Sequence, residues 1–98
     1  MKLSILVAAY NEENTILDCL KKVDAIILPN NFQKEIIVVN DASRDNTGKL
    51  LDTVKDKYRV FHHEKNRGKG AAIRTGISMA TGDYIVMQDA DLELDPND

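Results

Sequence analysis

Four short apolar segments alternate with three segments of helical periodicity, and this order constrains the fold more than any other feature. The apolar segments have the length of single β-strands and lie at residues 4–9, 35–40, 59–63 and 83–88. Between the first two, Ile16, Leu20 and Val23 recur at helical spacing. A β-α-β-α-β-α-β order, with right-handed crossovers between the strands, predicts an α/β fold with a parallel sheet.

The predicted helices begin and end at recognisable signals. Asn11 can cap the first helix, whose apolar stripe extends from Ile16 to Ile27 before a proline breaks it. The second and third helices are expected over residues 47–57 and 71–80. Small residues along the third helix would let it pack closely on the sheet.

Length and composition limit the chain to one domain of an ordinary globular kind. It has 98 residues, of which 43% are hydrophobic and 30% charged, so it can form a core. It has no apolar run of about 18 residues that would span a membrane. The first residues become polar too soon for a secretory signal. The single Cys19 cannot form an internal disulfide, which favours a cytoplasmic location.

The formal charge of −3 conceals two parts of opposite sign. Residues 1–82 hold all 13 Lys and Arg and ten acids, whereas residues 83–98 hold six acids and no base. An acidic end attracts cations and disfavours nucleic acid as a partner. An exposed acidic terminus is the simpler explanation, although the strand that leads into it makes that explanation less complete.

Polar side chains follow each predicted strand at the edge where parallel sheets bind ligands. All strands of such a sheet end on this edge, and a crevice forms where the strand order reverses. The residues concerned are Tyr10 and Glu12 after the first strand, Asp41 after the second, Arg67 and Lys69 after the third, and Asp89 and Asp91 after the fourth. We therefore expect one ligand site there, although polar loops at this edge are common in α/β proteins.

The segment GDYIVMQDAD (residues 82–91) is interpreted as a buried strand that ends in two acids. Asp89 and Asp91 are two residues apart, so their side chains point to the same face of an extended backbone. A divalent cation between the two carboxylates would relieve their repulsion and attract phosphate oxygens. Two solvated loop acids are the alternative. His62 and His63 are adjacent, so their side chains diverge; we interpret them as surface or edge residues, not ligands.

Four motifs, taken in sequence order, resemble the signatures of one enzyme family. They are VAAYNEE (residues 7–13), VVNDASRDNT (residues 38–47), NRGKGAA (residues 66–72) and QDADL (residues 88–92). The family is that of inverting nucleotide-sugar glycosyltransferases of the GT-A fold, which includes polyprenyl-phosphate mannose and glucose synthases. The resemblance covers nearly the whole chain. It implies a Rossmann-like three-layer α/β/α fold with a parallel sheet of strand order 3-2-1-4, the N-terminal half of a GT-A fold.

The resemblance implies a UDP- or GDP-sugar as donor and gives roles to several residues. Tyr10 and Glu12 would border the base and the ribose, and Ala9 would belong to the same nucleotide-binding set. Asp41 would accept a hydrogen bond from a ring N–H of the base, and Lys69 would approach the diphosphate or the sugar. Without the resemblance, Tyr10 can be an edge residue packed beside a helix, and Lys69 a solvated loop base. Asp41 can be a turn acid before the second helix, which Asp45 or Asn46 could cap equally well.

The resemblance also implies a Mg²⁺ or Mn²⁺ ion. Asp91 would coordinate this ion directly, and Asp89 would reach the ribose or, through water, the metal. The ion would neutralise negative charge on the departing nucleoside diphosphate. Oxygen ligands suit these two metals, whereas zinc prefers His or Cys.

Two departures from the family pattern limit what the chain is expected to do alone. Ala8 stands where relatives often have proline, which affects loop stiffness more than chemistry. The family's catalytic base lies beyond the metal motif, and this chain ends at Asp98. We therefore assign no catalytic residue and expect residues 1–98 to be the inactive donor-binding part of a longer enzyme with an unknown acceptor. Its exposed sheet edge could pair two copies, and the full-length protein could lie at the cytoplasmic face of a membrane.

Other classes of nucleotide-binding protein fit the sequence less well. A dehydrogenase would have a Gly-x-Gly-x-x-Gly turn after the first strand, where this chain has AYNE. A receiver domain would have its acidic pair there, but Glu12 and Glu13 enter a helix. A nucleotidyltransferase would have a loop rich in glycine and arginine. The strongest alternative is a non-catalytic module that binds a nucleoside diphosphate and a metal.

Overall fold

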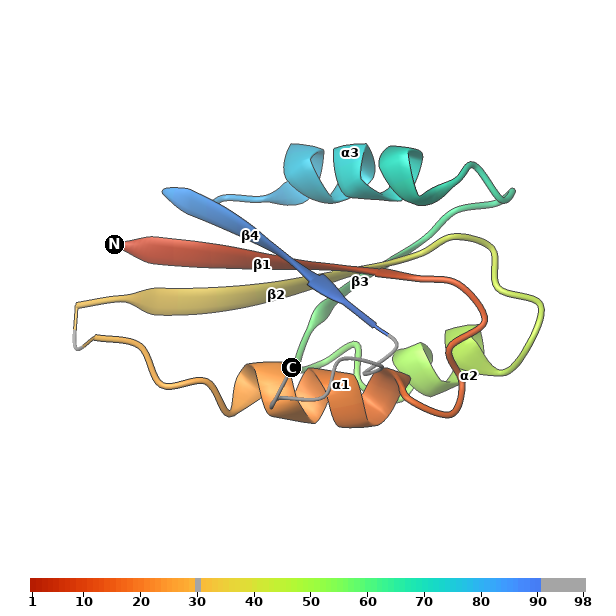
Figure 1. The fold of residues 1–98 in the computed structure, drawn as a ribbon, viewed down its shortest axis with the longest axis horizontal. Coiled ribbons are helices and arrows are strands. Elements are labelled where there is room, and N and C mark those ends of the chain that lie inside the picture. Colours follow the sequence, from red (N-terminus) through yellow and green to blue (C-terminus); the bar gives the residue numbers. More distant parts are fainter. Residues whose placement is uncertain (30, 91–98) are drawn as a thin grey trace, which may run out of the picture.

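Strands and helices alternate along the chain in the predicted β-α-β-α-β-α-β order (Figure 1). The structure, a computed structural model, describes residues 1–29 and 31–90. The elements are β1 (Lys2–Ala9), α1 (Ile16–Asp24), β2 (Gln33–Asn40), α2 (Thr47–Asp52), β3 (Arg59–His62), α3 (Lys69–Met79) and β4 (Tyr84–Asp89). Each predicted strand is present, with ends that differ from the prediction by no more than two residues.

The four strands form one parallel sheet in the predicted order, β3-β2-β1-β4. In the register, Ile5 of β1 lies between Ile36 of β2 and Val86 of β4. The chain adds β2 and β3 on one side of β1, and then returns to place β4 on the other side. The strand order therefore reverses between β1 and β4, and the carboxyl ends of these strands are where a crevice is expected.

Helices cover both faces of the sheet and complete the predicted three-layer α/β/α fold. α1 and α2 lie on one face, below the sheet in Figure 1, and α3 lies on the other. Apolar residues of β1 and β2 alternate between the two layers because successive side chains of a strand point to opposite faces. The cluster against α1 and α2 includes Ile5, Val7, Ile36 and Val38, and the cluster against α3 includes Leu6, Ile37, Val39 and Ala72.

α3 packs closely on the sheet because its buried residues are small. These residues are Ala72 and Gly76, and a Cβ atom on Gly76 would lie 3.2 Å from the methyl carbons of Leu6. A larger side chain at Gly76 would therefore push α3 away from β1. The close packing that the small residues predicted is confirmed.

The first two helices are shorter than predicted. α1 begins after Thr15, and Asn11 does not cap it. Asn11 instead has a φ of 52°, and its side-chain oxygen accepts a hydrogen bond from the backbone N–H of Arg44 at 2.8 Å. Asparagine tolerates this left-handed conformation, which turns the chain before the helix begins. The predicted stripe also extended too far, because Ile27 lies beyond α1 and is 93% exposed. α2 ends at Asp52 and gives way to turns up to residue 57.

β4 differs from the inner strands because most of its side chains are exposed. The prediction of a buried strand was wrong: Tyr84, Ile85, Val86 and Met87 are each between 41% and 59% exposed. The physical reason is that α3 packs over β1 and β2, and no other strand in the described part of the chain pairs with the outer edge of β4. Pairing of two copies through this edge stays a prediction.

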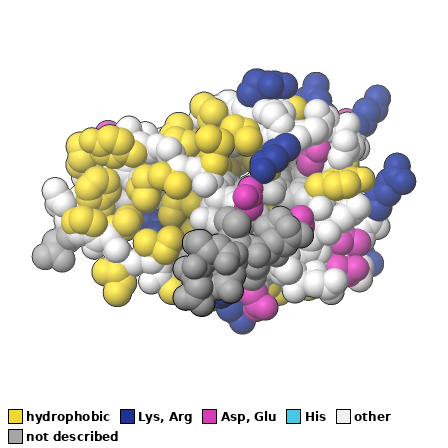
Figure 2. Space-filling view, in the orientation of Figure 1, with side chains coloured by type: hydrophobic (Ala, Val, Ile, Leu, Met, Phe, Trp, Pro, Cys, Tyr) yellow, Lys and Arg dark blue, Asp and Glu magenta, His cyan; other side chains and the backbone are white. Residues whose placement is uncertain are grey.

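The two ends of the sheet differ in surface chemistry. Hydrophobic side chains gather on the left of Figure 2, where β4 begins, and charged side chains gather on the right, where the strands end. Among residues 1–29 and 31–90, no helix is both long and apolar enough to cross a membrane. The cytoplasmic location stays a prediction.

Candidate functional site

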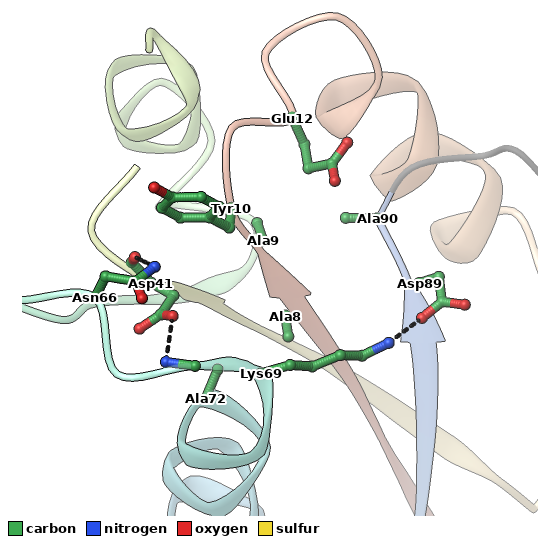
Figure 3. A pocket seen from close by; sticks show the side chains of 11 residues that line it. Ala8, Ala9, Tyr10, Glu12, Asp41, Asn66, Lys69, Ala72, Asp89 and Ala90 are labelled. Carbon is green, nitrogen blue, oxygen red and sulfur yellow. Dashed lines mark hydrogen bonds and ion pairs between the residues drawn. The ribbon is translucent and has the colours of Figure 1, made fainter. Parts of the chain in front are cut away.

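A cavity of about 380 Å³ lies at the carboxyl ends of the strands, between the segments that follow β1 and β4. Figure 3 shows that its walls come from several separate segments of the chain. The lining residues are Ala8, Ala9, Tyr10, Glu12, Asp41, Asn66, Gly68, Lys69, Ala72, Asp89 and Ala90. All six residues that were predicted to contact a nucleotide line it, namely Ala9, Tyr10, Glu12, Asp41, Lys69 and Asp89. Their roles in binding stay predictions.

Hydrogen bonds hold the segment after β1 against the segment after β2. The backbone N–H of Asn11 donates to Ser43 Oγ at 2.9 Å. The backbone N–H of Glu12 donates to Thr47 Oγ1 at 2.8 Å, and Thr47 is fully buried, so water does not compete for this bond. These contacts fix the backbone from which Tyr10 and Glu12 reach the cavity.

Asp45 braces the same two segments. Its carboxylate accepts hydrogen bonds from the backbone N–H of Thr47 at 2.9 Å and of Glu13 at 3.2 Å. Burial opposes ionisation of Asp45, but the hydrogen bonds from Thr47 and Glu13 outweigh this effect and hold the pKa of the carboxyl below its ordinary value. Of the three residues considered for the turn before α2, Asp45 therefore accepts the hydrogen bonds of Thr47, the first residue of that helix.

Asp41 lines the cavity although it is only 4% exposed. Its Oδ1 accepts hydrogen bonds from His63 Nδ1 at 2.8 Å and from the backbone N–H of Arg67 at 2.9 Å. Its Oδ2 accepts one from the backbone N–H of Gly68 at 2.8 Å. Burial opposes ionisation, but these three bonds outweigh it and hold the pKa of Asp41 below its ordinary value of 3.8. Of the four lone-pair positions of a carboxylate, the described residues occupy three, which leaves one on Oδ2.

The two histidines diverge as predicted, but His63 is not a surface residue. His62 is partly exposed, and its ring contacts Asp52 at 2.9 Å. The side chain of His63 is 3% exposed, and its Nε2 lies 2.8 Å from Thr75 Oγ1 in α3. The interpretation of His63 as a surface or edge residue was therefore wrong. Hydrogen bonds at both ring nitrogens, to Asp41 and Thr75, offset the cost of burying it.

Lys69 and Asp89 reach across the cavity and form an ion pair (Figure 3). Lys69 Nζ lies 2.9 Å from Asp89 Oδ1, and the two side chains are 68% and 48% exposed. An ion pair this exposed contributes about 1 kcal/mol or less, so both groups can exchange partners at little cost. The backbone carbonyl of Asp89 accepts a hydrogen bond from Cys19 Sγ at 3.2 Å, which anchors the end of β4 to α1.

The predicted direct metal ligand, Asp91, lies outside the described residues. Within residues 1–29 and 31–90, no three His, Cys, Asp or Glu side chains form a group that could hold a metal ion. The acidic side chains that line the cavity are those of Glu12, Asp41 and Asp89. They offer only oxygen donors, which Mg²⁺ and Mn²⁺ prefer, so the donor chemistry fits the predicted ion.

Two residues of the loop before α3 line the cavity without having been predicted. Asn66 donates from Nδ2 to the backbone carbonyl of Asp41 at 3.3 Å. Gly68 has a φ of 96°, which other residues rarely adopt, so the glycine in NRGKG was a signal that could have identified it. Arg67, which was also expected at this edge, contributes its backbone N–H to Asp41, and it is not among the residues that line the cavity.

The model of glycosyl transferase family 2 matches residues 4–98. This chain belongs to that family. The poly-beta-1,6-N-acetyl-D-glucosamine synthase of Staphylococcus epidermidis is 38% identical over 95 residues, which are 95% of this chain and 22% of that protein. The synthase of the same name from Staphylococcus aureus (strain MSSA476) is 39% identical over the same shares of the two chains. This family 2 chain thus spans less than a quarter of the length of these relatives.

Solved structures share the fold of this family 2 chain. TarS 1–349 of S. aureus, in complex with UDP-GlcNAc, matches with a TM-score of 0.80 and 29% identity, over 93% of this chain and 27% of that chain. The mannosyltransferase PcManGT from Pyrobaculum calidifontis, in complex with GDP-Man and Mn²⁺, matches with a TM-score of 0.81 and 28% identity, over 91% and 27%. The resemblance to glycosyltransferases of the GT-A fold is confirmed.

Proposed function

We propose that this chain binds the donor of an inverting, metal-dependent glycosyltransferase, which transfers a sugar from a UDP- or GDP-sugar to an acceptor. The observation that carries the proposal is the cavity, which brings Tyr10, Asp41, Lys69 and Asp89 together from separate segments. Its volume of about 380 Å³ lies within the range of small-molecule sites, roughly 300–1,000 Å³. The ligands of two similar structures, UDP-GlcNAc and GDP-Man with Mn²⁺, support the same ligand class.

The base and the ribose would lie on the side of the cavity formed by Ala9, Tyr10 and Glu12. Tyr10 is 39% exposed and offers an aromatic ring against which a base can pack. Asp41 has a lowered pKa, so it stays an acceptor, and its remaining lone-pair position suits a ring N–H. Uracil and guanine have such a group on the edge that pairs with other bases, whereas cytosine has a ring acceptor there. The site would therefore prefer UDP or GDP over CDP.

The diphosphate would lie beside Lys69 and Asp89. Its negative charge attracts the Lys69 ammonium and repels the Asp89 carboxylate, so Lys69 would leave Asp89 and turn to the phosphates. The exposed ion pair that is lost costs about 1 kcal/mol or less. Asp89 would then be available to the ribose or, together with Asp91, to a Mg²⁺ or Mn²⁺ ion. When bound, that ion would shield the charge of the diphosphate as it leaves the sugar.

A non-catalytic module that binds a nucleoside diphosphate and a metal is the second candidate. This candidate is favoured because every residue that we assign would bind the donor or its metal ion. We assign no catalytic base to this chain. A chain that spans 22% of a related synthase need not hold a complete catalytic centre. Both candidates require the same donor cavity, and they differ only in turnover.

Thermal unfolding with and without ligand tests the binding proposal. UDP or GDP should raise the melting temperature of the chain in the presence of Mg²⁺ or Mn²⁺ and not in EDTA. At a hundredfold excess of nucleotide over Kd, the free energy of unfolding should rise by about 2.7 kcal/mol. CDP is the matched control and should have a smaller effect. Asp91→Ala should abolish the dependence on metal. An unchanged metal response in that variant would contradict the metal assignment, and no response to either nucleotide would contradict the proposal itself.

Turnover separates the two candidates. The chain would be incubated with radiolabelled UDP-GlcNAc or GDP-mannose and Mn²⁺, and free nucleoside diphosphate would be measured. Metal-dependent binding without release of UDP or GDP would favour the module, or a donor-binding part of a larger enzyme. Steady release that Asp89→Ala abolishes would show catalysis by these 98 residues.

A further inference from the structure

His63 is buried where three elements of the fold meet. It follows the last residue of β3, and its backbone N–H donates to the carbonyl of Asn40 at the end of β2 at 2.8 Å. Its ring lies between Asp41 and Thr75 of α3, with 2.8 Å on each side. A histidine in the core is usually only a satisfied packing residue, but this one contacts a carboxylate that lines the cavity.

The partners of His63 determine how its ring is used. Asp41 has a lowered pKa and is therefore an ionised carboxylate, which can only accept hydrogen bonds. Nδ1 of His63 must carry the proton of the bond to Oδ1. Nε2 faces the hydroxyl of Thr75, which can rotate to suit it. The ring is thus held at both nitrogens, and the carboxylate is held at one oxygen by a side chain that water does not reach.

Asp41 in turn shapes the loop that leads to Lys69. Its two oxygens accept from the backbone N–H groups of Arg67 and Gly68, the two residues before α3. Gly68 takes a φ of 96°, so this backbone is far from the conformation that the chain adopts by default. A rotation of the Asp41 carboxylate would remove the acceptors of both N–H groups. It would also turn away the remaining lone-pair position on Oδ2.

We propose that His63 is a positioning residue for the nucleotide site: its Nδ1 hydrogen bond sets the orientation of the Asp41 carboxylate, and through it that of the base contact and of the loop at Gly68. The inference deepens the proposed function and rests on it. His63 does not line the cavity and would not touch the ligand. Its effect reaches the ligand only through Asp41.

Two variants of His63 separate its hydrogen bond to Asp41 from its hydrogen bond to Thr75. The amide nitrogen of asparagine is bonded to Cγ, as Nδ1 of histidine is, so His63→Asn keeps a donor for Asp41 and loses Thr75. The longer glutamine places its amide nearer the position of Nε2, so His63→Gln keeps a partner for Thr75 and loses Asp41. Thr75→Val is the matched control on the other side of the ring. His62→Asn is the control for a histidine that is adjacent in sequence and faces Asp52 instead.

Calorimetric titration with UDP and GDP in Mn²⁺, at a temperature where each variant is folded, measures the effect. His63→Gln should weaken nucleotide binding about tenfold or more, as expected for the loss of a hydrogen bond to a charged group. His63→Asn, Thr75→Val and His62→Asn should bind within about twofold of the unaltered chain. Equal affinity in His63→Gln, or an equal loss in His63→Asn and His63→Gln, would overturn the proposal, because the histidine would then act only through packing.

A second measurement needs no nucleotide. In proton–nitrogen NMR spectra of the free chain, the Gly68 and Arg67 amide protons should resonate at low field because they bond a carboxylate. His63→Gln should move both resonances upfield and speed their exchange with solvent, while His63→Asn and His62→Asn should leave them in place. If the unaltered chain binds neither nucleotide, the proposed function fails, and the proposed site for His63 fails with it. If nucleotide binds but these resonances do not respond, only the positioning role is overturned.

Discussion

A hydrogen-bonded carboxylate lies near each end of β2, and the two carboxylates have different partners. Glu35 lies near the beginning of the strand, with a side chain that is 9% exposed, and Asp41 follows its last residue. Both accept several hydrogen bonds, and the pKa of each is below its ordinary value. Only Asp41 lines the cavity where the segments after β1 and β4 meet. Glu35 lines a different and smaller cavity, of about 180 Å³, so a hydrogen-bonded, ionised carboxylate does not by itself identify a candidate site.

At the amino end, Glu35 joins neighbouring strands to each other. Its Oε2 accepts from Ser4 Oγ in β1 at 2.5 Å and from the backbone N–H of Thr81 at 2.7 Å. Its Oε1 accepts from Arg59 of β3 at 3.1 Å. These partners join β1, β3 and the segment before β4, whereas Asp41 lines the cavity for which we propose a nucleotide. The comparison predicts that changes at Glu35 affect stability alone and changes at Asp41 affect binding as well.

The largest expected effect is that of Glu35→Gln. Its amide NH₂ replaces an acceptor with a donor that faces other donors, so the free energy of unfolding in urea should fall by about 3 kcal/mol. Affinity of the folded fraction for UDP should stay within about twofold. Glu64→Gln, at an exposed position, is the control and should change stability by about 0.5 kcal/mol or less.

The same change at the other end, Asp41→Asn, sharpens the comparison. It should also destabilise the chain, and it should weaken UDP binding about tenfold or more because the loop amides and the base lose a charged acceptor. Titration calorimetry measures the affinity of Glu35→Gln and Asp41→Asn for UDP. Similar losses of affinity in Glu35→Gln and Asp41→Asn would show that the two ends of β2 are not functionally distinct.

The pH dependence of stability should report the Glu35 network. Burial opposes ionisation of Glu35, but hydrogen bonds from Ser4, Thr81 and Arg59 outweigh it and lower the pKa from 4.5 to about 2. Because the folded-state pKa is below the ordinary value, the ionised group stabilises the fold above about pH 4.5, and this contribution of roughly 3 kcal/mol is lost as the pH falls towards 2. Asp41 adds to the loss with the same sign.

Urea unfolding at pH 6 and at pH 3 measures this loss. The unaltered chain should lose more stability between the two values than Glu35→Gln does, because the variant has no carboxyl at this position. Equal losses in both proteins would mean that Glu35 is not the titrating group. Nucleotide affinity of Glu35→Gln at pH 6 serves as the check that the cavity is intact.

Gly82 tests how closely the segments pack at the amino end. A Cβ atom there would lie 2.5 Å from Ser4 Oγ, 2.8 Å from Ser4 N and 2.9 Å from the Lys2 carbonyl oxygen, so the backbone would have to move. Gly82→Ala should lower the free energy of unfolding by about 2 kcal/mol and leave nucleotide affinity unchanged. Gly70→Ala is the control: its nearest neighbour is an Arg74 nitrogen at 3.5 Å, so stability should stay equal or rise slightly.

Apart from the control variants, the smallest expected change in stability is that of Gly68→Ala. No atom lies within 4 Å of a Cβ atom at this position, so the cost comes only from the φ of 96° and should be about 1 kcal/mol. Binding of UDP should nevertheless weaken, because the loop that leads to Lys69 moves. Of the two glycine variants, Gly82→Ala should therefore lose more stability, and Gly68→Ala should lose more affinity for UDP. A larger loss of affinity in Gly82→Ala than in Gly68→Ala would contradict the division between the two ends.

Local sequence patterns predicted the fold correctly where one pattern dominated. The short apolar segments of β1 and β2 indicated strands, and the alternation of strands with helices implied a parallel sheet. The same topology placed Tyr10, Asp41, Lys69 and Asp89 at one edge before any contact was known. Asn11 and Ile27 were predicted wrongly because a capping residue and an apolar residue have several uses, and local sequence does not choose between them.

The sequence by itself determined which residues could form strands, which could form helices, and which polar groups would lie at the edge where the strands end. These properties depend on neighbours in the chain. Only the tertiary structure decided that β4 is exposed, that Lys69 pairs with Asp89, and that His63 is buried. The partners of His63 are Asp41, 22 residues before it, and Thr75, 12 residues after it. Such groups meet only when the crossovers bring β2, β3 and α3 together, because burial and hydrogen bonding depend on distance in space.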